Sequence, residues 1–475
     1  MTPAEYTARD AIGLAELVRS GEVSAAEVLD AMIAQTEATN PTLNAIVAER
    51  FDAARADVRA GLLPDGPFRG VPYVIKNLHA PVVGLPLTHG SRLYAGTTTT
   101  FDSTTVARLR AAGFVIVGRS NAPEFGMSVT TEPTLHGPTR NPWRITHSPG
   151  GSSGGAAAAV AGGMLPAAHA TDSLGSIRIP AACCGLVGLK PTRGRNPVGP
   201  HRGDAMMGLS HEHAVTRSVR DCAAILDATA GPDEGAPWFT APPAESFLSQ
   251  VGHDPGRLRI GLVTRSWTGV AVHPDCVAAV RQVGQACAAF GHDVEDTAID
   301  IDGDALFDAC NTILLSGLAG LVRMREAELG RPTAAGEIER LTRACVTRWE
   351  ATSAIALHGA NARINAVVRD AARQMRGFDV VLTPTLSRPP VALGEMADTD
   401  DCNGFMRQLG DYAAFTPLFS ASGQPAMNLP MFCNAQGLPI GVQAVAKFTD
   451  DATLFRLAAQ LEPGFVGLPP GSLGR

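Results

Sequence analysis

Two serine-containing loops form the part of the sequence best suited to chemistry. The first spans residues 150–155 and reads GGSSGG, and the second spans residues 171–176 and reads TDSLGS. A serine hydroxyl becomes a nucleophile toward an acyl carbon when a neighbouring group takes its proton. The pair of loops can therefore supply both a nucleophile and a second hydroxyl that passes the proton on.

Two other kinds of site require patterns that these loops lack. A Gly-rich turn before a helix can bind phosphate through its free N–H groups. The P-loop ends in Gly-Lys-Ser/Thr, whereas residues 153–155 read SGG. The nucleophile elbow of hydrolases requires Gly-x-Ser-x-Gly, and residues 175–178 read GSIR. The loop sequences alone do not decide between an anion-binding turn and a pair of catalytic serines.

Lysine usage indicates a base. The chain has 39 basic residues, of which only Lys76, Lys190 and Lys447 are lysines. A coding bias toward arginine can account for part of this. Lys76 lies in the apolar run GVPYVIKN, where it is either an edge residue that reaches water or a buried amine. A buried amine can lose its proton near neutral pH, which arginine cannot do, so Lys76 is a candidate general base.

The segments around the loops predict the elements that position them. The Ala-rich run 156–161 predicts a tightly packed helix, and the apolar run 165–170 predicts a strand that returns the chain. Both loops can then lie near one end of a sheet. This context argues against a flexible linker, the usual interpretation of a Gly-Ser run. Residues 66–80 predict a core strand with Lys76 at its end, and residues 114–118 predict a short, buried parallel strand.

The sequence resembles the amidase signature family. The match is close over residues 150–192 and extends to residues 70–77, 109–125 and 423–462. The resemblance implies an α/β fold in which a large, mixed and twisted β-sheet core is surrounded by helices. It also implies hydrolysis of a carboxylic amide C–N bond through a serine acyl-enzyme, with no metal or cofactor.

The resemblance also implies a Ser–cisSer–Lys triad. Ser176 matches the nucleophile, Ser152 matches the bridging serine that follows a cis peptide bond, and Lys76 matches the general base. The further residues expected at the site are the backbone oxyanion-hole donors Ser173, Leu174, Gly175 and Ser176 and the supporting residues Ser153 and Arg178.

Two positions depart from the family pattern. Leu174 stands where the family usually has glycine, and leucine tolerates a positive φ poorly, so we expect an ordinary backbone conformation there. Asn77 replaces the aspartate that usually follows the lysine, which removes a negative charge and favours the neutral amine.

Several functions stay open at this point. Residues 377–390 and 415–417 resemble the branch that contains 6-aminohexanoate-cyclic-dimer hydrolase and aryl acylamidases, which implies small, aryl or oligomeric amides. A carbamate (urethane) hydrolase and the catalytic subunit of a tRNA-dependent amidotransferase are alternatives on the same scaffold. A non-catalytic anion-binding protein is disfavoured because Lys76, Ser152 and Ser176 are all retained.

The chain is expected to form a single domain of 475 residues. Its expected parts are N-terminal helices at 1–65, a catalytic core at 66–230, a variable helical region that shapes the substrate pocket at 231–376, and a return to the core sheet at 377–475. Ser24 and Glu27 form a capping box for a helix that Pro41 is expected to end near Thr39.

The composition and charge of the chain limit which binding partners and which location are expected. A net charge of −7 gives no reason to expect nucleic acid or an anionic membrane. No run of 18 apolar residues lacks glycine or charge, so a membrane span is not expected. The start of the chain shows no basic and apolar leader, and nine cysteines without a CxxC fit reduced thiols, so we expect a cytoplasmic protein. The expected partner is a small amide or carbamate, and the expected state is a monomer or homodimer.

Two smaller clusters receive structural interpretations. Residues 211–213 read HEH, which is weak as a metal motif, and we expect a polar loop before a helix at 220–229. Cys183 and Cys184 are expected in the core.

Overall fold

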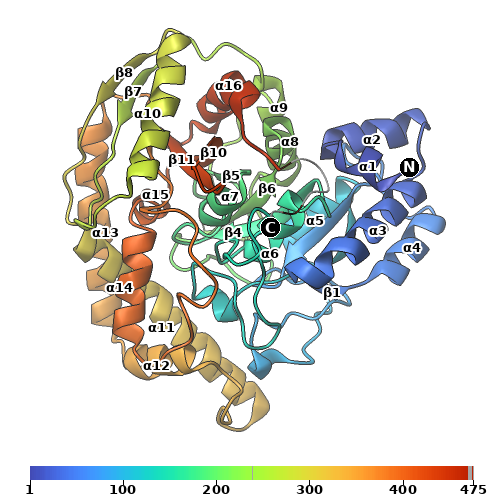
Figure 1. Ribbon diagram of the computed structural model, residues 1–475. Helices are drawn as coiled ribbons and strands as arrows, with labels where there is room; N and C mark the ends of the chain where they lie inside the picture. The colour runs from blue at the N-terminus through green and yellow to red at the C-terminus, as the bar shows by residue number, and fades with distance from the viewer. Residues whose placement is uncertain (238, 469–472, 474–475) are drawn as a thin grey trace.

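The computed structural model describes residues 1–237, 239–468 and 473. Helices surround a large, mixed β-sheet of eight strands, which confirms the predicted fold class (Figure 1). The strands, in spatial order, are β4 (Ala167–Asp172), β6 (His211–Thr216), β5 (Val187–Lys190), β10 (Ala426–Cys433), β11 (Pro439–Ala446), β9 (Val380–Pro384), β7 (Arg259–Leu262) and β8 (Asp293–Asp296).

The sheet changes direction along its width. Strand β7 runs parallel to β8 and β9, whereas the neighbours from β4 through β11 to β9 are antiparallel. The antiparallel pair β10–β11 needs only a short turn, but the parallel pair β7–β8 needs a crossover. Helix α10 (Pro274–Ala289) is that crossover.

A second sheet of three strands carries Lys76. Its order is β1 (Ile46–Glu49), β3 (Val115–Ser120) and β2 (Pro72–Lys76), with β2 and β3 parallel and fully buried. The connecting helix α5 (Thr104–Ala111) lies between them in the chain. The prediction of a strand that ends at Lys76 is confirmed. The Lys76 N–H donates to His169 Nδ1 at 3.3 Å, which joins β2 to strand β4 of the large sheet.

Helix α6 (Gly154–Ala161) packs closely against these strands, as the Ala-rich run predicts. All of its residues but Ala161 are buried. At Gly155, a Cβ atom would stand 2.3 Å from Asn121 N and 2.7 Å from Ala45 O. Only glycine therefore fits at this position, where the first serine loop enters the helix.

Helices from the N-terminal part cover one side of the molecule. They are α1 (Pro3–Thr7), α2 (Ala11–Ser20), α3 (Ala25–Leu43) and α4 (Phe51–Arg59). The capping box of Ser24 and Glu27 is present. The expected end near Thr39 is wrong, because Pro41 lies within the last turn of α3. A proline there removes one hydrogen bond, and the Asn44 N–H still binds Asn40 O beyond it.

Five helices form a wall on the opposite side of the molecule (Figure 1). They are α11 (Gly303–Leu329), α12 (Arg340–Trp349), α13 (Ala354–Met375), α14 (Cys402–Tyr412) and α15 (Pro417–Ser422). Their apolar faces share one core with Leu174 of the second serine loop and with Ile179, three residues after that loop. The remaining helices are α7 (Arg178–Cys184), α8 (Val219–Thr229), α9 (Phe247–Gln250) and α16 (Asp451–Leu461), with short 3₁₀ turns at Arg92–Tyr94, Glu124–Gly126 and Glu462–Gly464.

Helix α11 was not expected to resemble a membrane span. Among the described residues it is the one helix long and apolar enough to cross a membrane by length and composition. In its most apolar window, 56% of the residues are buried inside the molecule. A core helix passes the same test, so this property reflects its packing in the wall.

Residues 211–213 do not form the expected polar loop. They begin the buried strand β6. Each side chain has a buried neighbour: His211 Nδ1 lies 3.3 Å from Asp172 O, Glu212 contacts Arg202 and His169, and His213 Nε2 lies 3.4 Å from Cys222 Sγ. These pairings let polar residues occupy a position that sequence alone assigns to solvent.

The expectation of reduced thiols is wrong for two cysteines. A disulfide joins Cys345 of α12 to Cys402 of α14 across 57 residues of sequence. Cys183 and Cys184 are free and buried in α7, as expected. Disulfides are rare in the cytosol, so this bond gives no support to a cytoplasmic location, which stays a prediction.

Candidate active site

Lys76 is completely buried and contacts two hydroxyl groups. Its Nζ atom lies 2.7 Å from Ser152 Oγ and 2.9 Å from Thr171 Oγ1. Burial lowers the pKa of Lys76 from 10.5 to about 7, although the negative charges of Asp172 and Glu212 oppose the shift. The amine can therefore be neutral at physiological pH and accept a proton from Ser152.

The first serine loop is fixed in place at the end of strand β4. The Gly151–Ser152 peptide bond is cis, as expected. The Ser153 hydroxyl donates to the Thr171 carbonyl and accepts from the Thr171 N–H, both at 3.3 Å. Ser153 thereby positions Thr171 opposite the Lys76 amine.

The second serine loop turns around a buried carboxylate. Asp172 accepts hydrogen bonds from the Gly175 N–H at 2.7 Å and the Ile177 N–H at 3.2 Å. Its two oxygens also accept from the Arg178 guanidinium at 2.8 Å each. Burial alone would raise the pKa of Asp172, but the charge and hydrogen bonds of Arg178 outweigh this and hold the pKa well below its usual range.

The loop leaves three free backbone donors. The Gly175 N–H is used by Asp172, so it is not available as an oxyanion donor in this structure. Among the described residues, no protein group accepts from the N–H of Ser173, Leu174 or Ser176. Leu174 does not adopt a positive φ, whereas Gly175 has φ +137° and a Cβ there would stand 2.4 Å from Thr416 Oγ1. The expectation for Leu174 is thus confirmed.

Residues near the C-terminus lock this loop. The Arg178 guanidinium donates to Thr416 O at 3.0 Å, Gln443 Oε1 at 2.6 Å and Ser420 Oγ at 2.9 Å. The Thr416 hydroxyl donates to Leu174 O at 2.5 Å. Helix α15 and strand β11 therefore hold a loop that lies more than 200 residues earlier in the chain.

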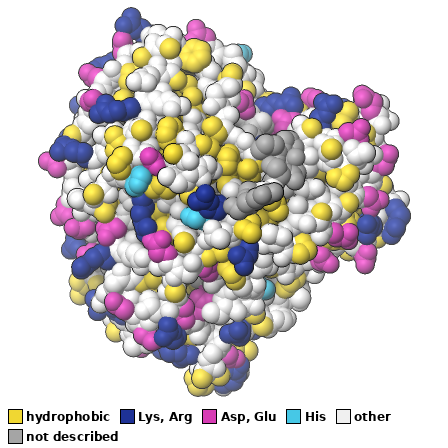
Figure 2. All heavy atoms as spheres, in the orientation of Figure 1, with side chains coloured by type: hydrophobic (Ala, Val, Ile, Leu, Met, Phe, Trp, Pro, Cys, Tyr) yellow, Lys and Arg dark blue, Asp and Glu magenta, His cyan; other side chains and the backbone are white. Residues whose placement is uncertain are grey.

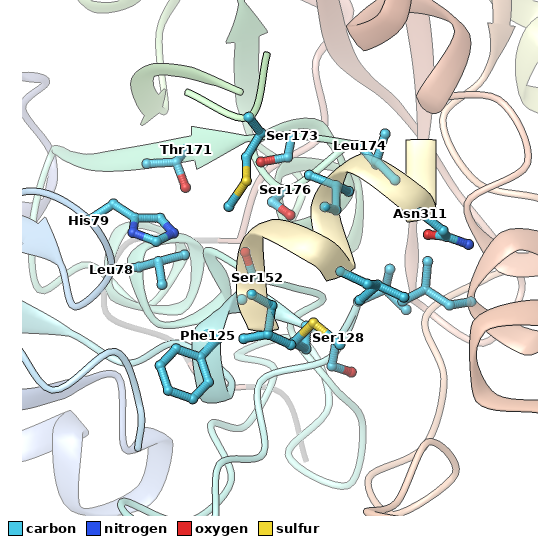
Figure 3. Close-up of a pocket in the computed structure, with 18 of the residues that line it drawn as sticks. Leu78, His79, Phe125, Ser128, Ser152, Thr171, Ser173, Leu174, Ser176 and Asn311 are labelled. Atoms are coloured by element: carbon cyan, nitrogen blue, oxygen red, sulfur yellow. The ribbon is translucent and has the colours of Figure 1, made fainter. Parts of the chain in front are cut away.

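Ser152 and Ser176 open into one pocket between the core and the helical wall (Figure 3). No hydrogen bond joins the two hydroxyls among the described residues. The polar side chains that line the pocket are His79, Ser128, Ser152, Thr171, Ser173, Ser176 and Asn311. The others are apolar: Leu78, Phe125, Met127, Val129, Leu174, Ile179, Met206, Leu314, Leu315, Leu318, Leu321, Met406 and Leu409. No side chain among these lining residues carries a fixed charge.

The sequence interpretation missed several of these residues. The loop pattern gives Asp172 no role of its own, whereas the structure pairs its buried carboxylate with Arg178. Nothing in the sequence marks Asn311 or Met406, because only packing of α11 and α14 brings them to the pocket. No group of three or more potential metal ligands occurs within the described ranges.

Known proteins with similar sequences were found for nearly the whole chain. The family model described as Amidase matches residues 27–455. The chain is 39% identical over 467 residues to the 6-aminohexanoate-cyclic-dimer hydrolase of Paenarthrobacter ureafaciens, covering 96% of this chain and 94% of the relative.

Solved structures of related proteins also resemble this chain over nearly its whole length. The structure of 6-aminohexanoate cyclic dimer hydrolase matches with a TM-score of 0.91 and 38% identity, covering 97% of each chain. A bacterial aryl acylamidase of the amidase signature family matches with a TM-score of 0.87 and 27% identity, covering 96% of each chain.

Proposed function

Since the chain belongs to the amidase signature family and is a hydrolase that acts on amide bonds, we propose that Ser176 cleaves the amide through an acyl-enzyme, with Ser152 and Lys76 as its proton relay. The observation that carries this proposal is the 2.7 Å contact between Ser152 Oγ and a buried lysine whose pKa is about 7. A base with a pKa near the working pH is the most effective one.

The relay works in both directions. Neutral Lys76 takes the Ser152 proton while Ser152 takes the Ser176 proton, and Ser176 Oγ forms a bond to the carbonyl carbon. Thr171 accepts a hydrogen bond from the amine, which aims the nitrogen lone pair at Ser152. When the C–N bond breaks, the proton passes back through Ser152 to the leaving nitrogen. A water molecule then attacks the acyl-enzyme and gives its proton to Lys76 through Ser152. The acid is released when the proton returns to Ser176.

Backbone N–H groups of the second serine loop stabilise the negative charge on the carbonyl oxygen. Ser173, Leu174 and Ser176 are the candidate donors, because the Gly175 N–H binds Asp172. Each such donor is worth roughly 3 kcal/mol of barrier. Asp172 and Arg178 take no part in proton transfer and act by holding the loop.

The substrate is a small, neutral amide. The pocket lining is apolar apart from a few uncharged groups, and a charged substrate would lose its hydration there without gaining a counter-ion. Similarity to a cyclic-dimer hydrolase and an aryl acylamidase supports oligomeric alkyl amides and anilides as first candidates. Hydrolysis of a panel of alkyl amides, anilides and carbamates will rank them.

A Ser176→Ala variant tests the nucleophile. Removing a triad nucleophile lowers kcat by several orders of magnitude, so we expect a loss of more than about a thousandfold. Ser128→Ala is the matched control, because Ser128 lines the same pocket but its hydroxyl binds Thr130. It should change kcat by less than tenfold. A serine-reactive phosphonate should label the parent at residue 176 and leave Ser176→Ala unlabelled; retained activity in that variant would exclude the mechanism.

A further inference from the structure

Three polar side chains that line the pocket have no role in the relay and no hydrogen-bond partner among the described residues: His79, Ser173 and Asn311. Ser173 belongs to the second serine loop beside Ser176, so His79 and Asn311 are the two that lie away from that loop. Among the described residues, neither ring nitrogen of His79 and no atom of the Asn311 amide is hydrogen-bonded. Ser128, the other polar lining residue away from the relay, is already paired with Thr130.

His79 is held in the pocket by its backbone. It lies three residues after Lys76 and has φ +61°, a conformation that is uncommon for residues other than glycine. Its N–H donates to His89 Nδ1 at 3.4 Å, and its carbonyl lies 3.1 Å from His201 Nε2. Burial and the nearby Arg202 lower the pKa of His79 well below its usual range, so the imidazole offers one donor and one acceptor without charge.

Asn311 is almost completely buried on helix α11. Its exposed fraction is 6%, and its neighbours along the pocket are Leu314, Leu315 and Leu318. The amide of Asn311 makes no hydrogen bond to the described residues and lines the pocket. A polar group placed in an otherwise apolar pocket wall can fix the orientation of a ligand there by hydrogen bonding.

The two groups lie at opposite ends of the pocket. Figure 3 shows His79 on one side, Asn311 on the other, and Ser152 and Ser176 between them. His79 comes from the core after strand β2, and Asn311 comes from the helical wall. A substrate that reaches both must extend to each side of the bond that Ser176 attacks.

We propose that His79 and Asn311 are specificity-determining residues that bind uncharged polar groups on either side of the scissile bond. This inference rests on the proposed function of Ser176. The substrate is then an elongated neutral amide whose apolar chain carries a second hydrogen-bonding group, such as another amide, remote from the cleaved one. The carboxamide of Asn311 can donate to a remote carbonyl and accept from a remote N–H at the same time.

The test compares paired substrates on paired variants. One substrate of each pair carries a remote amide, either on its acyl side or on its amine side, and its partner has methylene groups in place of that amide. Asn311→Leu should lower kcat/KM by about tenfold for the remote-amide substrate on one of these sides, which corresponds to one lost hydrogen bond, and leave the methylene partner within threefold. His79→Gly, which suits the positive φ, should do the same for the other side.

Two further variants separate recognition from folding. Leu321→Met alters the pocket without adding a hydrogen-bonding group. It should change kcat/KM by the same factor for both substrates of a pair. Asn311→Asp should gain activity on a substrate that carries a remote ammonium group, which the parent rejects. Equal losses on both members of a pair for Asn311→Leu and His79→Gly would overturn this inference, even if Ser176→Ala is inactive and the proposed function stands.

Discussion

As the proposed general base, Lys76 should set the pH dependence of the reaction. Its pKa of about 7 means that kcat/KM should rise with pH through one ionisation near neutrality and then level off. Lys76→Arg keeps the charge but cannot give up its proton, so it should be as inactive as Lys76→Ala. Steady-state rates between pH 5 and pH 10, within the range where the parent stays folded, test this. Near-parent activity in Lys76→Arg would show that Lys76 supplies only positive charge and does not act as a base.

The same residue should cost the protein stability. Because the folded pKa is depressed below 10.5, the unfolded chain holds a proton that the folded chain has lost between about pH 7 and pH 10.5. Below pH 7 the folded chain bears the full cost of a buried ammonium, and above pH 10.5 the cost disappears. Lys76→Met should therefore raise the Tm most at or below pH 7, with a gain that shrinks toward pH 10.5. A gain that is independent of pH would mean that packing alone is responsible.

Asp172 should affect both stability and rate, because it organises the second serine loop. Asp172→Asn leaves the buried Arg178 without its counter-ion, and breaking such a pair costs about 3–5 kcal/mol of unfolding free energy. We also expect a lower kcat, because the Gly175 and Ile177 N–H groups lose their acceptor. In the parent, Asp172 adds to the free energy of unfolding. This stabilisation is fully present above the ordinary pKa of about 3.9 and is lost as pH falls through the depressed pKa of the folded state.

The control for Asp172 is a second buried ion pair. Asp451 binds Arg195 at 3.1 Å and is equally inaccessible, but neither residue lines the pocket. Asp451→Asn should lose comparable stability in urea unfolding while keeping the parent kcat at temperatures well below its Tm. If both variants lose kcat equally, general destabilisation accounts for the effect.

At the scale of elements, the disulfide between α12 and α14 is a brace for the pocket wall. Met406 and Leu409 line the pocket, and Met406 stands one turn after Cys402 on the same helix. Closing a loop of this length is worth about 4 kcal/mol in the chain-entropy model. Cys402→Ser or a reductant should lower the Tm and raise KM more than it lowers kcat. Cys433→Ser, at a half-buried free cysteine, is the control; a Tm unaffected by reductant would show that the brace contributes nothing.

Elements with a local signal were predictable from sequence, and those that depend on partners were not. The Ala-rich run gave α6, and the apolar run before Asn77 gave β2. The short strands β1 and β8 and the helices α14 and α15 were not predicted, because their stability comes from neighbouring elements rather than from their own pattern. Strand β6 was misread as a loop for the same reason, since its polar side chains find buried partners.

At the scale of the whole molecule, the site combines a predictable half and an unpredictable half. The proposed relay residues lie within recognisable motifs, so the sequence alone could nominate them. The residues that support and shape the site, such as Thr416, Gln443 and Asn311, are contributed by segments that meet only in the folded chain. The exterior adds little information about the substrate, because Figure 2 shows acidic and basic side chains interspersed over the visible face.

The Arg178 guanidinium depends on hydrogen-bond acceptors from Thr416, Ser420 and Gln443, which are made late in synthesis of the chain. A ribosome that makes 5–20 residues each second needs roughly 15 to 50 s to travel from the nucleophile to the last of these residues. Throughout that interval the nascent chain already contains Lys76, Ser152 and Ser176 but lacks Gln443, and for most of it the chain also lacks Thr416 and Ser420. We expect a chain released after residue 413 to hydrolyse nothing above background, and activity in that fragment would show that the loop organises itself. On this expectation, an unfinished chain would not hydrolyse amides in the cell that makes it.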